Sequence, residues 1–324
     1  MHNMEIARYP LISVCIPTYN RQDLLKRALN SVIIQQYWNM EIIISDNCSP
    51  QKIWEEIRQL DTLDSRITVR RNLENLGWTG NLNECLKIAK GEYIIFLCDD
   101  DEFLPGLIEK EAEILCKNNN VGLIHTDGYY CDFNGNIIRS QSTSKPILKA
   151  GEEAIEKIFF KMDVFFSSAM VRKKCYYELS EFTNTCSADW EMWARIAQYY
   201  DVAYIQEPLV KFHQHNISMM PAIKFESDTL FLMEKILSYL PIEKRELMKQ
   251  TLLKNLGAVF FAFVQKAWQE GKWKHGSSFL LIARKYSGIV LWIKKLLTLI
   301  IYSVPRRIKY SRLTKIKRNE TFVS

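Results

Sequence analysis

The stretch ISVCIPTYNRQDLLKRALNSVIIQQ, residues 12–36, decides the fold. Its first part, residues 12–18, is a short apolar and β-branched run with a proline near its end. In residues 23–36 the apolar side chains recur at helical spacing. The stretch therefore predicts a strand followed directly by a helix.

The same alternation of strand and helix continues along the chain. Further strands are predicted at residues 41–45, 67–70 and 93–97, with helices between them at 50–60 and 79–90. The strand segments are continuous apolar runs, which are typical of parallel strands buried on both faces. The sequence thus predicts an α/β fold, with a mostly parallel sheet and helices on both of its faces.

Strand signals end at about residue 220, and residues 223–302 show the pattern of several helices. We therefore expect a sheet domain at residues 1–220 and a helical C-terminal region at residues 221–324. The length of 324 residues and the hydrophobic content of 48% exclude collagen, low-complexity disorder and a chain too short to bury a core.

Charge is distributed unevenly along the chain. Residues 284–324 contain eleven Lys or Arg and one acid, Glu320, which gives +10. Since the whole chain carries +6, the remaining residues sum to −4 (6 − 10). This asymmetry argues against a nucleic-acid-binding protein and predicts a local anionic partner for the tail.

The tail also has an amphipathic pattern. In residues 289–304 the side chains of Trp292 and Ile293 fall on an apolar helical face, and Lys294 and Lys295 fall on another. This pattern predicts peripheral contact with an anionic membrane, and the alternative is a helix packed on the sheet domain. No uncharged apolar stretch reaches the roughly eighteen residues that a membrane span requires.

The compartment is predicted from the cysteines and the start of the chain. The eight cysteines show neither metal-ligand spacing nor a disulfide framework, and the first ten residues contain no apolar core of a secretory signal. We therefore expect a cytoplasmic protein that lies peripherally on the inner face of the cell membrane.

Three consecutive carboxylates, Asp99, Asp100 and Asp101, follow the apolar strand predicted at 93–97. Their mutual repulsion favours a bound cation, and Mg²⁺ or Mn²⁺ is the hard divalent ion that carboxylates suit. The alternative is a solvated acidic turn before the helix predicted near Pro105, where negative charge is favourable.

Three other polar positions have a functional and a structural interpretation. Asp46 ends a buried strand, where it can accept a hydrogen bond from a nucleobase or form an ordinary turn. Asp189 falls in the first turn of a helix over 187–197, as a general base or as a helix cap. His215 can reach a phosphate or the metal, or it can straddle a strand with His213.

The order and spacing of these segments resemble the inverting glycosyltransferases of family 2, which have the GT-A fold. The matching segments are ISVCIPTYNR (12–21), EIIISDN (41–47), NLENLGWTGNLN (72–83), GEYIIFLCDDDEFLPG (91–106), ADWEMWARIA (188–197) and EPLVKFHQHNIS (207–218). The resemblance covers residues 10–220, about two thirds of the chain.

The resemblance implies a role for each matching position. The residues implied to bind the nucleotide sugar are Pro17, Tyr19, Asn20, Asp46, Gly77, Asn83 and Asp99. It implies that Asp99 contacts the ribose side, that Asp100 together with Asp101 holds the metal bridging the diphosphate, and that Asp189 is the catalytic base. The candidate metal set comprises Asp99, Asp100, Asp101 and His215.

Three positions depart from the family pattern. Cys98 stands where many relatives begin the acidic motif with Asp, so which two of the following carboxylates bind the metal stays open. Leu82 stands in place of an Arg that often precedes the helix Asn, and Ala188 in place of a Glu that often precedes the catalytic Asp.

The resemblance implies a metal-dependent glycosyltransferase that inverts the anomeric configuration. Its expected partners are a UDP- or dTDP-linked sugar donor and a glycan or lipid-linked acceptor in O-antigen, capsule or other surface polysaccharide synthesis. The alternative is a nucleotidyltransferase-like or nucleotide-binding protein without glycosyl transfer. A nucleotidyltransferase is expected to carry a Gly-rich phosphate loop with Lys or Arg near its first strand, and PTYNRQD lacks it.

Overall fold

The computed structural model describes residues 9–132, 135–141, 147–161, 164–213, 221–287 and 292. The chain forms two compact units. The first comprises Met1–His215 and Asp228–Arg245, and the second comprises Asn216–Ser227 and Glu246–Ser324. The two units therefore interleave in the sequence, and residues 228–245 belong to the same unit as the sheet.

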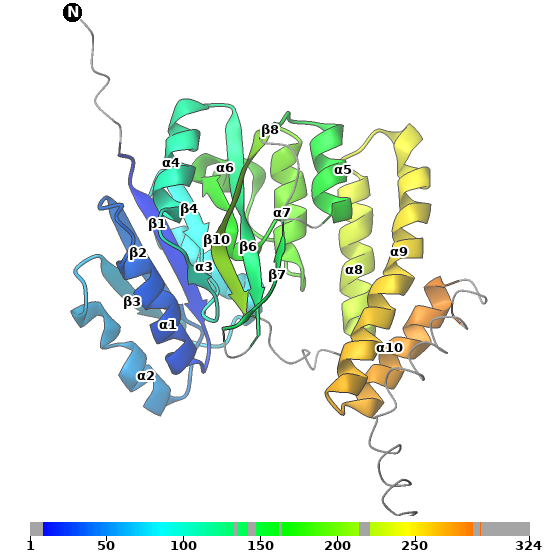
Figure 1. Cartoon of the computed structure of the whole chain (residues 1–324), viewed down its shortest axis with the longest axis horizontal. Coiled ribbons are helices and arrows are strands. Elements are labelled where there is room, and N and C mark those ends of the chain that lie inside the picture. Colours follow the sequence, from blue (N-terminus) through cyan, green and yellow to red (C-terminus); the bar gives the residue numbers. More distant parts are fainter. Residues whose placement is uncertain are drawn as a thin grey trace, which may run out of the picture. The chain divides into compact units, whose positions relative to one another are not determined.

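Four parallel strands form one half of the sheet (Figure 1). In the order β3-β2-β1-β4 they are β3 (Ile67–Arg71), β2 (Met40–Asp46), β1 (Ile12–Thr18) and β4 (Tyr93–Phe96). Each lies within one residue of its predicted bounds. The register pairs Thr18 with Asp46 and Asp46 with Arg71, so the carboxyl ends of these strands meet at one edge of the sheet.

The other half of the sheet is mixed. Its strands are β5 (Glu102–Phe103), β6 (Val121–Cys131), β7 (Ile137–Gln141), β8 (Ile147–Leu148), β9 (Met170–Arg172) and β10 (Asp201–His213). The short β9 runs antiparallel to both β4 and β6, whereas β6 and β10 are parallel. Strand β10 continues to His213 through register shifts on either side of Pro208, because proline has no N–H to donate to the neighbouring strand.

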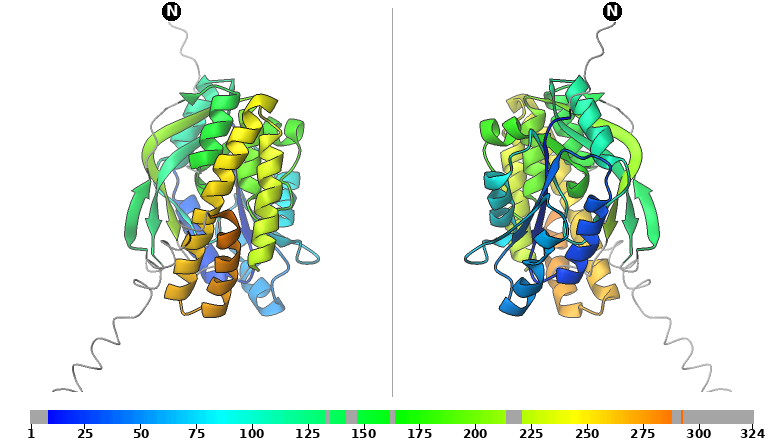
Figure 2. Two further views of the ribbon diagram at one scale, coloured as in Figure 1. Left: turned by 90° about the vertical axis from the view of Figure 1, so that its right-hand side faces the viewer. Right: turned by 90° about the vertical axis from the view of Figure 1, so that its left-hand side faces the viewer.

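Helices cover both faces of the sheet, as predicted. One face carries α1 (Gln22–Ile33), α2 (Gln51–Ile57) and α4 (Leu107–Lys117), whose apolar residues join one core cluster with Val14 and Ile42. The opposite face carries α3 (Gly77–Ile88), α6 (Lys173–Leu179) and α7 (Ala188–Ala197). Figures 1 and 2 show α1 and α2 beside the first three strands. The buried aliphatic side chains each contribute about 1.5–3 kcal/mol to stability.

Successive side chains of a strand point to opposite faces of the sheet, and both sets are buried in β1, so helices must cover both faces. Cys15 lies between Val14 and Ile16 on β1, so its side chain points to the opposite face, where it is hydrogen-bonded to Cys85 of α3. On the same side the ring of Phe96 packs edge-on against Tyr176 of α6, with the centroids 6.5 Å apart. Shorter helical segments are η1 (Leu60–Thr62), α5 (Glu152–Lys161) and η2 (Phe166–Ser168).

The C-terminal helices are α8 (Ala222–Leu237), α9 (Ile242–Gln269) and α10 (Trp273–Tyr286). In the second unit, the ring of Phe279 lies 5.9 Å from Phe260 and 5.1 Å from Phe263. The end of α10 is fixed by Lys285, whose Nζ lies 2.8 Å from Glu226, and by a hydrogen bond from Tyr286 to the same carboxylate. The predicted amphipathic segment at 289–304 lies outside the described residues except for Trp292.

Helix α9 differs from the expectation that no segment could span a membrane. Over an 18-residue window its mean hydropathy is 1.2, so by length and composition it could cross a bilayer. The sequence analysis counted uncharged runs, whereas a helix can carry one or two charged residues in such a window. Of this window, 41% is buried inside the protein, and one such helix is weak evidence for a membrane span.

Candidate active site

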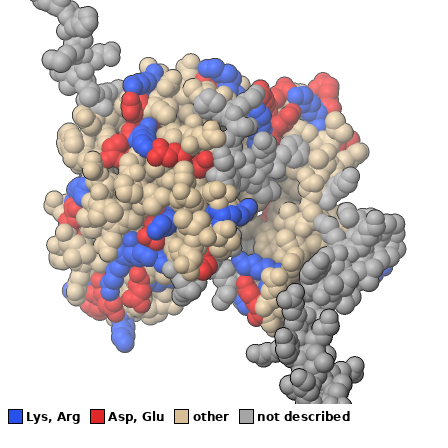
Figure 3. Space-filling model, in the orientation of Figure 1, with Lys and Arg blue, Asp and Glu red and all other residues tan. Residues whose placement is uncertain are grey.

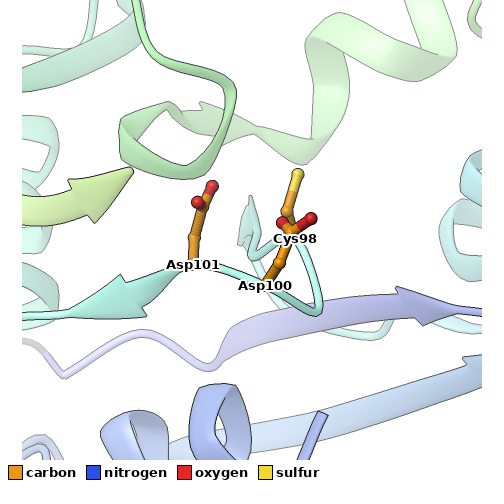
Figure 4. Close-up of side chains that lie close together, drawn as sticks. All are labelled: Cys98, Asp100 and Asp101. Carbon is orange, nitrogen blue, oxygen red and sulfur yellow. The ribbon is translucent and has the colours of Figure 1, made fainter. Parts of the chain in front are cut away.

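The acidic triplet lies in a tight turn directly after β4. The N–H of Asp101 donates to the carbonyl of Cys98 at 3.0 Å, which closes the turn. One ligand atom each from Cys98, Asp100 and Asp101 lies within 4.8 Å of the others. Figure 4 shows the three side chains projecting from this loop. Arg27 of α1 anchors the turn by donating to the Asp100 carbonyl at 2.7 Å.

Asp99 turns toward the end of β1. Its carboxylate accepts hydrogen bonds from the Thr18 hydroxyl at 2.7 Å and from Arg21 at 3.2 Å. Burial, together with the neighbouring charge of Asp100, raises the pKa of Asp99 to about 6, although both hydrogen bonds lower it. Asp99 is not part of the group of ligand atoms that lie within 4.8 Å of one another, which sets it apart from Asp100 and Asp101.

Asp101 turns to the opposite side of the loop. Its carboxylate accepts hydrogen bonds from the Ser167 hydroxyl at 2.5 Å and from the N–H of His213 at 3.1 Å. Burial and the charge of Asp100 raise the pKa of Asp101 well above its usual range. A divalent cation at this loop would reverse that effect, because it favours the ionised carboxylates.

The donor set of the cluster suits a hard divalent cation. Asp100 and Asp101 offer carboxylate oxygens, which Mg²⁺ and Mn²⁺ prefer. Burial raises the pKa of the Cys98 thiol well above its usual range, so this side chain stays protonated and is a poor ligand for such ions. The pair Asp100 and Asp101 therefore fits Mg²⁺ or Mn²⁺ best.

Arg21 is a charged residue of the site that the sequence analysis missed. Its guanidinium lies 2.7 Å from Asp100 and 3.2 Å from Asp99, and its side chain is half-exposed. The contact between Arg21 and Asp99, which lies 78 positions later in the sequence, depends on the pairing of β1 with β4, so local sequence does not reveal it.

Asp46 is fully buried at the end of β2, and its oxygens are occupied by Ser49. The Ser49 N–H donates to it at 3.1 Å, and the Ser49 hydroxyl also donates. Ser49 Oγ in turn accepts from the N–H of Asn20 at 2.9 Å. Asp46 therefore forms a turn with Ser49, which is the structural alternative that the sequence offered for it. Through Ser49 it also fixes Asn20, whose φ is 58°, beside the exposed Tyr19. Pro17 is buried within β1.

Gly77 and Asn83 lie at two different places on α3. Gly77 begins the helix with a φ of +72°, and a Cβ built there would meet nothing within 4 Å, so open space adjoins it. Asn83 instead exchanges two hydrogen bonds with the backbone of Phe182, at 3.2 and 3.0 Å. Its amide is therefore occupied in holding the segment that leads into α7.

Asp189 lies in the first turn of α7 and is partly buried. Burial raises the pKa of its carboxyl to about 6, although N–H groups of its own residue and of Trp190 lower it. Among the described residues, no side chain is seen to donate a hydrogen bond to this carboxylate. A carboxylate with a raised pKa that is not paired with a described side chain has the properties of a general base.

Segment η2 connects the acidic loop with α7. Ser167 bonds to Asp101, and it also accepts from the N–H of Cys98 at 3.1 Å. The neighbouring ring of Phe166 lies 6.3 Å from Trp193, which follows Asp189 by one helical turn. Phe166 also lies 5.3 Å from the exposed Trp78 of α3. The carboxylates Asp101 and Asp189 are thus mounted on neighbouring elements of one packed group.

The two histidines have different positions. His213 is buried at the end of β10, and its Nε2 lies 2.8 Å from Glu102. His215, the predicted metal ligand, lies outside the described residues.

On the face drawn in Figure 3, Lys and Arg are interspersed with Asp and Glu among the described side chains. This view shows no continuous basic surface there.

The chain belongs to glycosyl transferase family 2, which matches residues 13–179. The fold and the match together define a glycosyltransferase with the GT-A fold, as the motifs predicted. The family membership also favours glycosyl transfer over the nucleotidyltransferase alternative.

Three known proteins illustrate this relationship. An uncharacterized glycosyltransferase of Methanocaldococcus jannaschii is 33% identical over 212 residues, which cover 64% of this chain and 72% of that protein. The GalNAc(5)-diNAcBac-PP-undecaprenol beta-1,3-glucosyltransferase of Campylobacter jejuni is 38% identical over 120 residues, 37% of this chain and 38% of that protein. The structure of S. aureus TarS 1-349 in complex with UDP-GlcNAc has a TM-score of 0.60 at 15% identity, covering 83% of this chain and 80% of that one.

Proposed function

We propose that this chain is a metal-dependent, inverting glycosyltransferase of surface polysaccharide synthesis. Its donor is a UDP- or dTDP-linked sugar, and its acceptor is a hydroxyl of a glycan or lipid-linked intermediate of an O-antigen or capsule. The TarS complex with UDP-GlcNAc supports the donor class. The undecaprenol-linked substrate in the name of the Campylobacter relative supports the acceptor class.

This proposal rests mainly on one observation: η2 contacts both the acidic loop, through Asp101, and helix α7, which carries Asp189. Asp101 is buried, bonded to Ser167 and adjacent to Asp100, as a metal site requires. Asp189 lies one turn from Trp193, which packs on the neighbouring Phe166, and its carboxylate is not engaged by a described side chain. A protein that only binds a nucleotide would need the pair Asp100 and Asp101 but would not need Asp189.

The transfer is a direct displacement in which Asp189 acts as the base. The Asp189 carboxylate accepts the proton of the acceptor hydroxyl, and the hydroxyl oxygen attacks the anomeric carbon. As the new bond forms, the bond from that carbon to the diphosphate breaks, and the nucleoside diphosphate leaves with the bonding electron pair. No enzyme nucleophile takes part, so attack from the side opposite the leaving group inverts the configuration.

Charge on the leaving diphosphate must be stabilised for this step. Asp100 and Asp101 would hold Mn²⁺ or Mg²⁺, and the bound ion would supply positive charge that stabilises the diphosphate as a leaving group. Arg21 lies against Asp99 and Asp100 and adds a guanidinium, whose paired N–H groups suit phosphate oxygens.

A thermal-shift panel tests the donor class directly. UDP-, dTDP- and GDP-linked sugars are each added with and without Mn²⁺, because a ligand that binds the native state raises its stability by RT ln(1 + [L]/Kd). We expect UDP- or dTDP-sugars to raise Tm in the presence of Mn²⁺ and not with a chelator. Absence of any Mn²⁺-dependent shift across the panel would count against a nucleotide-sugar site.

The compartment and the membrane contact are part of the same proposal. The protein is cytoplasmic and lies peripherally on the inner face of the membrane, where a lipid-linked acceptor is accessible. The charge of +10 in residues 284–324 supports this contact, since each basic residue near an anionic surface contributes about 1 kcal/mol.

A further inference from the structure

Glu191 lies in the first turn of α7 together with Asp189, so it is the other carboxylate there that could act as a base. Its side chain is fully buried, and each of its oxygens has two partners. Oε2 accepts from Arg195 at 2.7 Å and from the Thr183 hydroxyl at 2.9 Å. With all of these contacts made inside the protein, Glu191 cannot take a proton from an acceptor hydroxyl.

The partners of the other oxygen come from the C-terminal helical region. Lys235 of α8 lies 3.3 Å from Glu191 Oε1, and the hydroxyl of Tyr239, just after α8, donates to the same oxygen. Lys235 also donates to Thr183 at 2.6 Å. These residues lie beyond the match to the family, which ends at residue 179, yet they belong to the unit that contains the sheet.

The same network fixes the segment that leads into α7. Arg195 donates to the carbonyls of Ser180 and Glu181, each at 3.1 Å, and Glu191 holds the Thr183 hydroxyl. Asn83 holds Phe182 between them. The backbone on both sides of Asp189 is therefore tied to one buried carboxylate.

We propose that Glu191 is a positioning residue for Asp189, and that Lys235 and Tyr239 act with it. Glu191 holds the first turn of α7 at a fixed angle to the preceding segment, and the two residues from the C-terminal region hold Glu191. This inference rests on the proposed role of Asp189. Its consequence is that α8 and the residues just after it contribute to turnover through Glu191.

The partners of Glu191 provide better tests than Glu191 itself. Removal of the buried carboxylate would leave Arg195 and Lys235 without their counter-charge, and such a variant can fail to fold. Tyr239→Phe removes one hydroxyl, and Lys235→Met removes one charge at similar side-chain length. Tyr200→Phe is the matched control, because Tyr200 also donates to a carboxylate, that of Glu178, outside this network.

The full-length variants are compared in kcat, in Kd for UDP with Mn²⁺, and in Tm, with the donor found by the panel. We expect Tyr239→Phe and Lys235→Met to lower kcat by about threefold to tenfold, since tenfold corresponds to only about 1.4 kcal/mol in the barrier. UDP affinity should stay within about twofold of the wild type. Lys235→Arg should restore kcat, and Tyr200→Phe should leave kcat unchanged even if its Tm falls.

Two results would overturn the inference: an unchanged kcat in both variants, or an equal fall in kcat for Tyr200→Phe at an equal loss of Tm. Asp189→Asn in the same series separates this inference from the proposed function. If Asp189→Asn keeps full turnover, the assignment of the base fails. If Asp189→Asn is inactive while Tyr239→Phe and Lys235→Met match the control, the positioning role alone fails.

Discussion

The Ser167 hydroxyl donates a 2.5 Å hydrogen bond to the Asp101 carboxylate across 66 residues of sequence. This contact places η2 against the acidic loop, while Phe166 of the same segment packs toward α7. The chemistry proposed for the site depends on this junction, because it joins the carboxylates proposed to bind the metal to the helix that carries the proposed base.

Replacement of Asp100 by Ala should abolish Mn²⁺-dependent binding of the donor. Asp101 remains, but one carboxylate does not provide the charge that a divalent ion at a diphosphate requires. Isothermal titration of UDP with and without Mn²⁺ measures the effect. Asp61→Ala, which removes an exposed carboxylate of η1, should bind as the wild type does. Donor binding by Asp100→Ala that still responds to chelator would exclude Asp100 as a ligand.

Replacement of Arg21 by Leu should make the protein depend more strongly on the metal. Arg21 is shared by Asp99 and Asp100, so its loss leaves their repulsion uncompensated in the metal-free protein. We expect a lower Tm without metal and a larger rise in Tm on addition of Mn²⁺, with an energetic effect of about 1 kcal/mol at this half-exposed position. Arg58→Leu, which breaks an exposed 3.5 Å pair with Glu55, is the control. Equal Mn²⁺ responses in both variants would show that Arg21 does not share the metal's position.

Replacement of Asp189 by Asn should lower kcat by about 10² or more and leave UDP affinity nearly unchanged. Because the base must be ionised, the wild-type rate should rise with pH through about 6, which is the raised pKa of Asp189, and then level off. The residual rate of Asp189→Asn should lack this step. A variant whose main defect is weak UDP binding would place Asp189 in the donor site instead.

The same pKa sets a stability test with a definite sign. The folded pKa of Asp189 is above its ordinary value of 3.8, so the native state binds the proton more tightly than the unfolded state. The wild type therefore loses stability as pH rises from about 4 to about 6, and Asp189→Asn does not. The Tm of Asp189→Asn minus the Tm of the wild type should therefore be larger at pH 8 than at pH 4. A constant difference in Tm between the two pH values would contradict the raised pKa.

Truncation tests the membrane contact, and the structure shows where to cut. A chain ending at residue 283 would lose Lys285 and Tyr286, which bind Glu226, so the cut belongs after Ser287. The truncated protein should still bind UDP and no longer sediment with phosphatidylserine vesicles. The full chain should sediment at low salt and be released at high salt, because screening weakens surface electrostatics. A full chain that ignores these vesicles at low salt would contradict the contact.

The sequence predicted the parallel half of the sheet well, because its strands are continuous apolar runs followed by polar turns. It did not predict β9 or η2, since three-residue segments such as Met170–Arg172 are too short to show a period. This omission matters for the site, because the partners of Asp101 and the packing of α7 both involve η2.

Long-range polar contacts were also beyond the sequence analysis. That Asp46 and Asn83 lie beside the nucleotide stays a prediction, and the structure adds contacts that the sequence did not show, with Ser49 and with the backbone of Phe182. Arg21 shows the opposite case, since nothing local distinguishes it from any other basic residue. Residue types and spacing indicate that a site exists. Which of its side chains contact the ligand and which hold other residues in place depends on the packed structure.

The most direct test of the central claim is the release of nucleoside diphosphate by the full-length protein. The protein is incubated with Mn²⁺ and the donor found by the panel, with water or a glycan as acceptor, and the anomeric configuration of the product is followed by NMR. We predict nucleotide release that chelator and Asp189→Asn both suppress, with a product of inverted configuration. A product that retains the donor configuration, or release that is indifferent to both chelator and Asp189→Asn, would contradict the account.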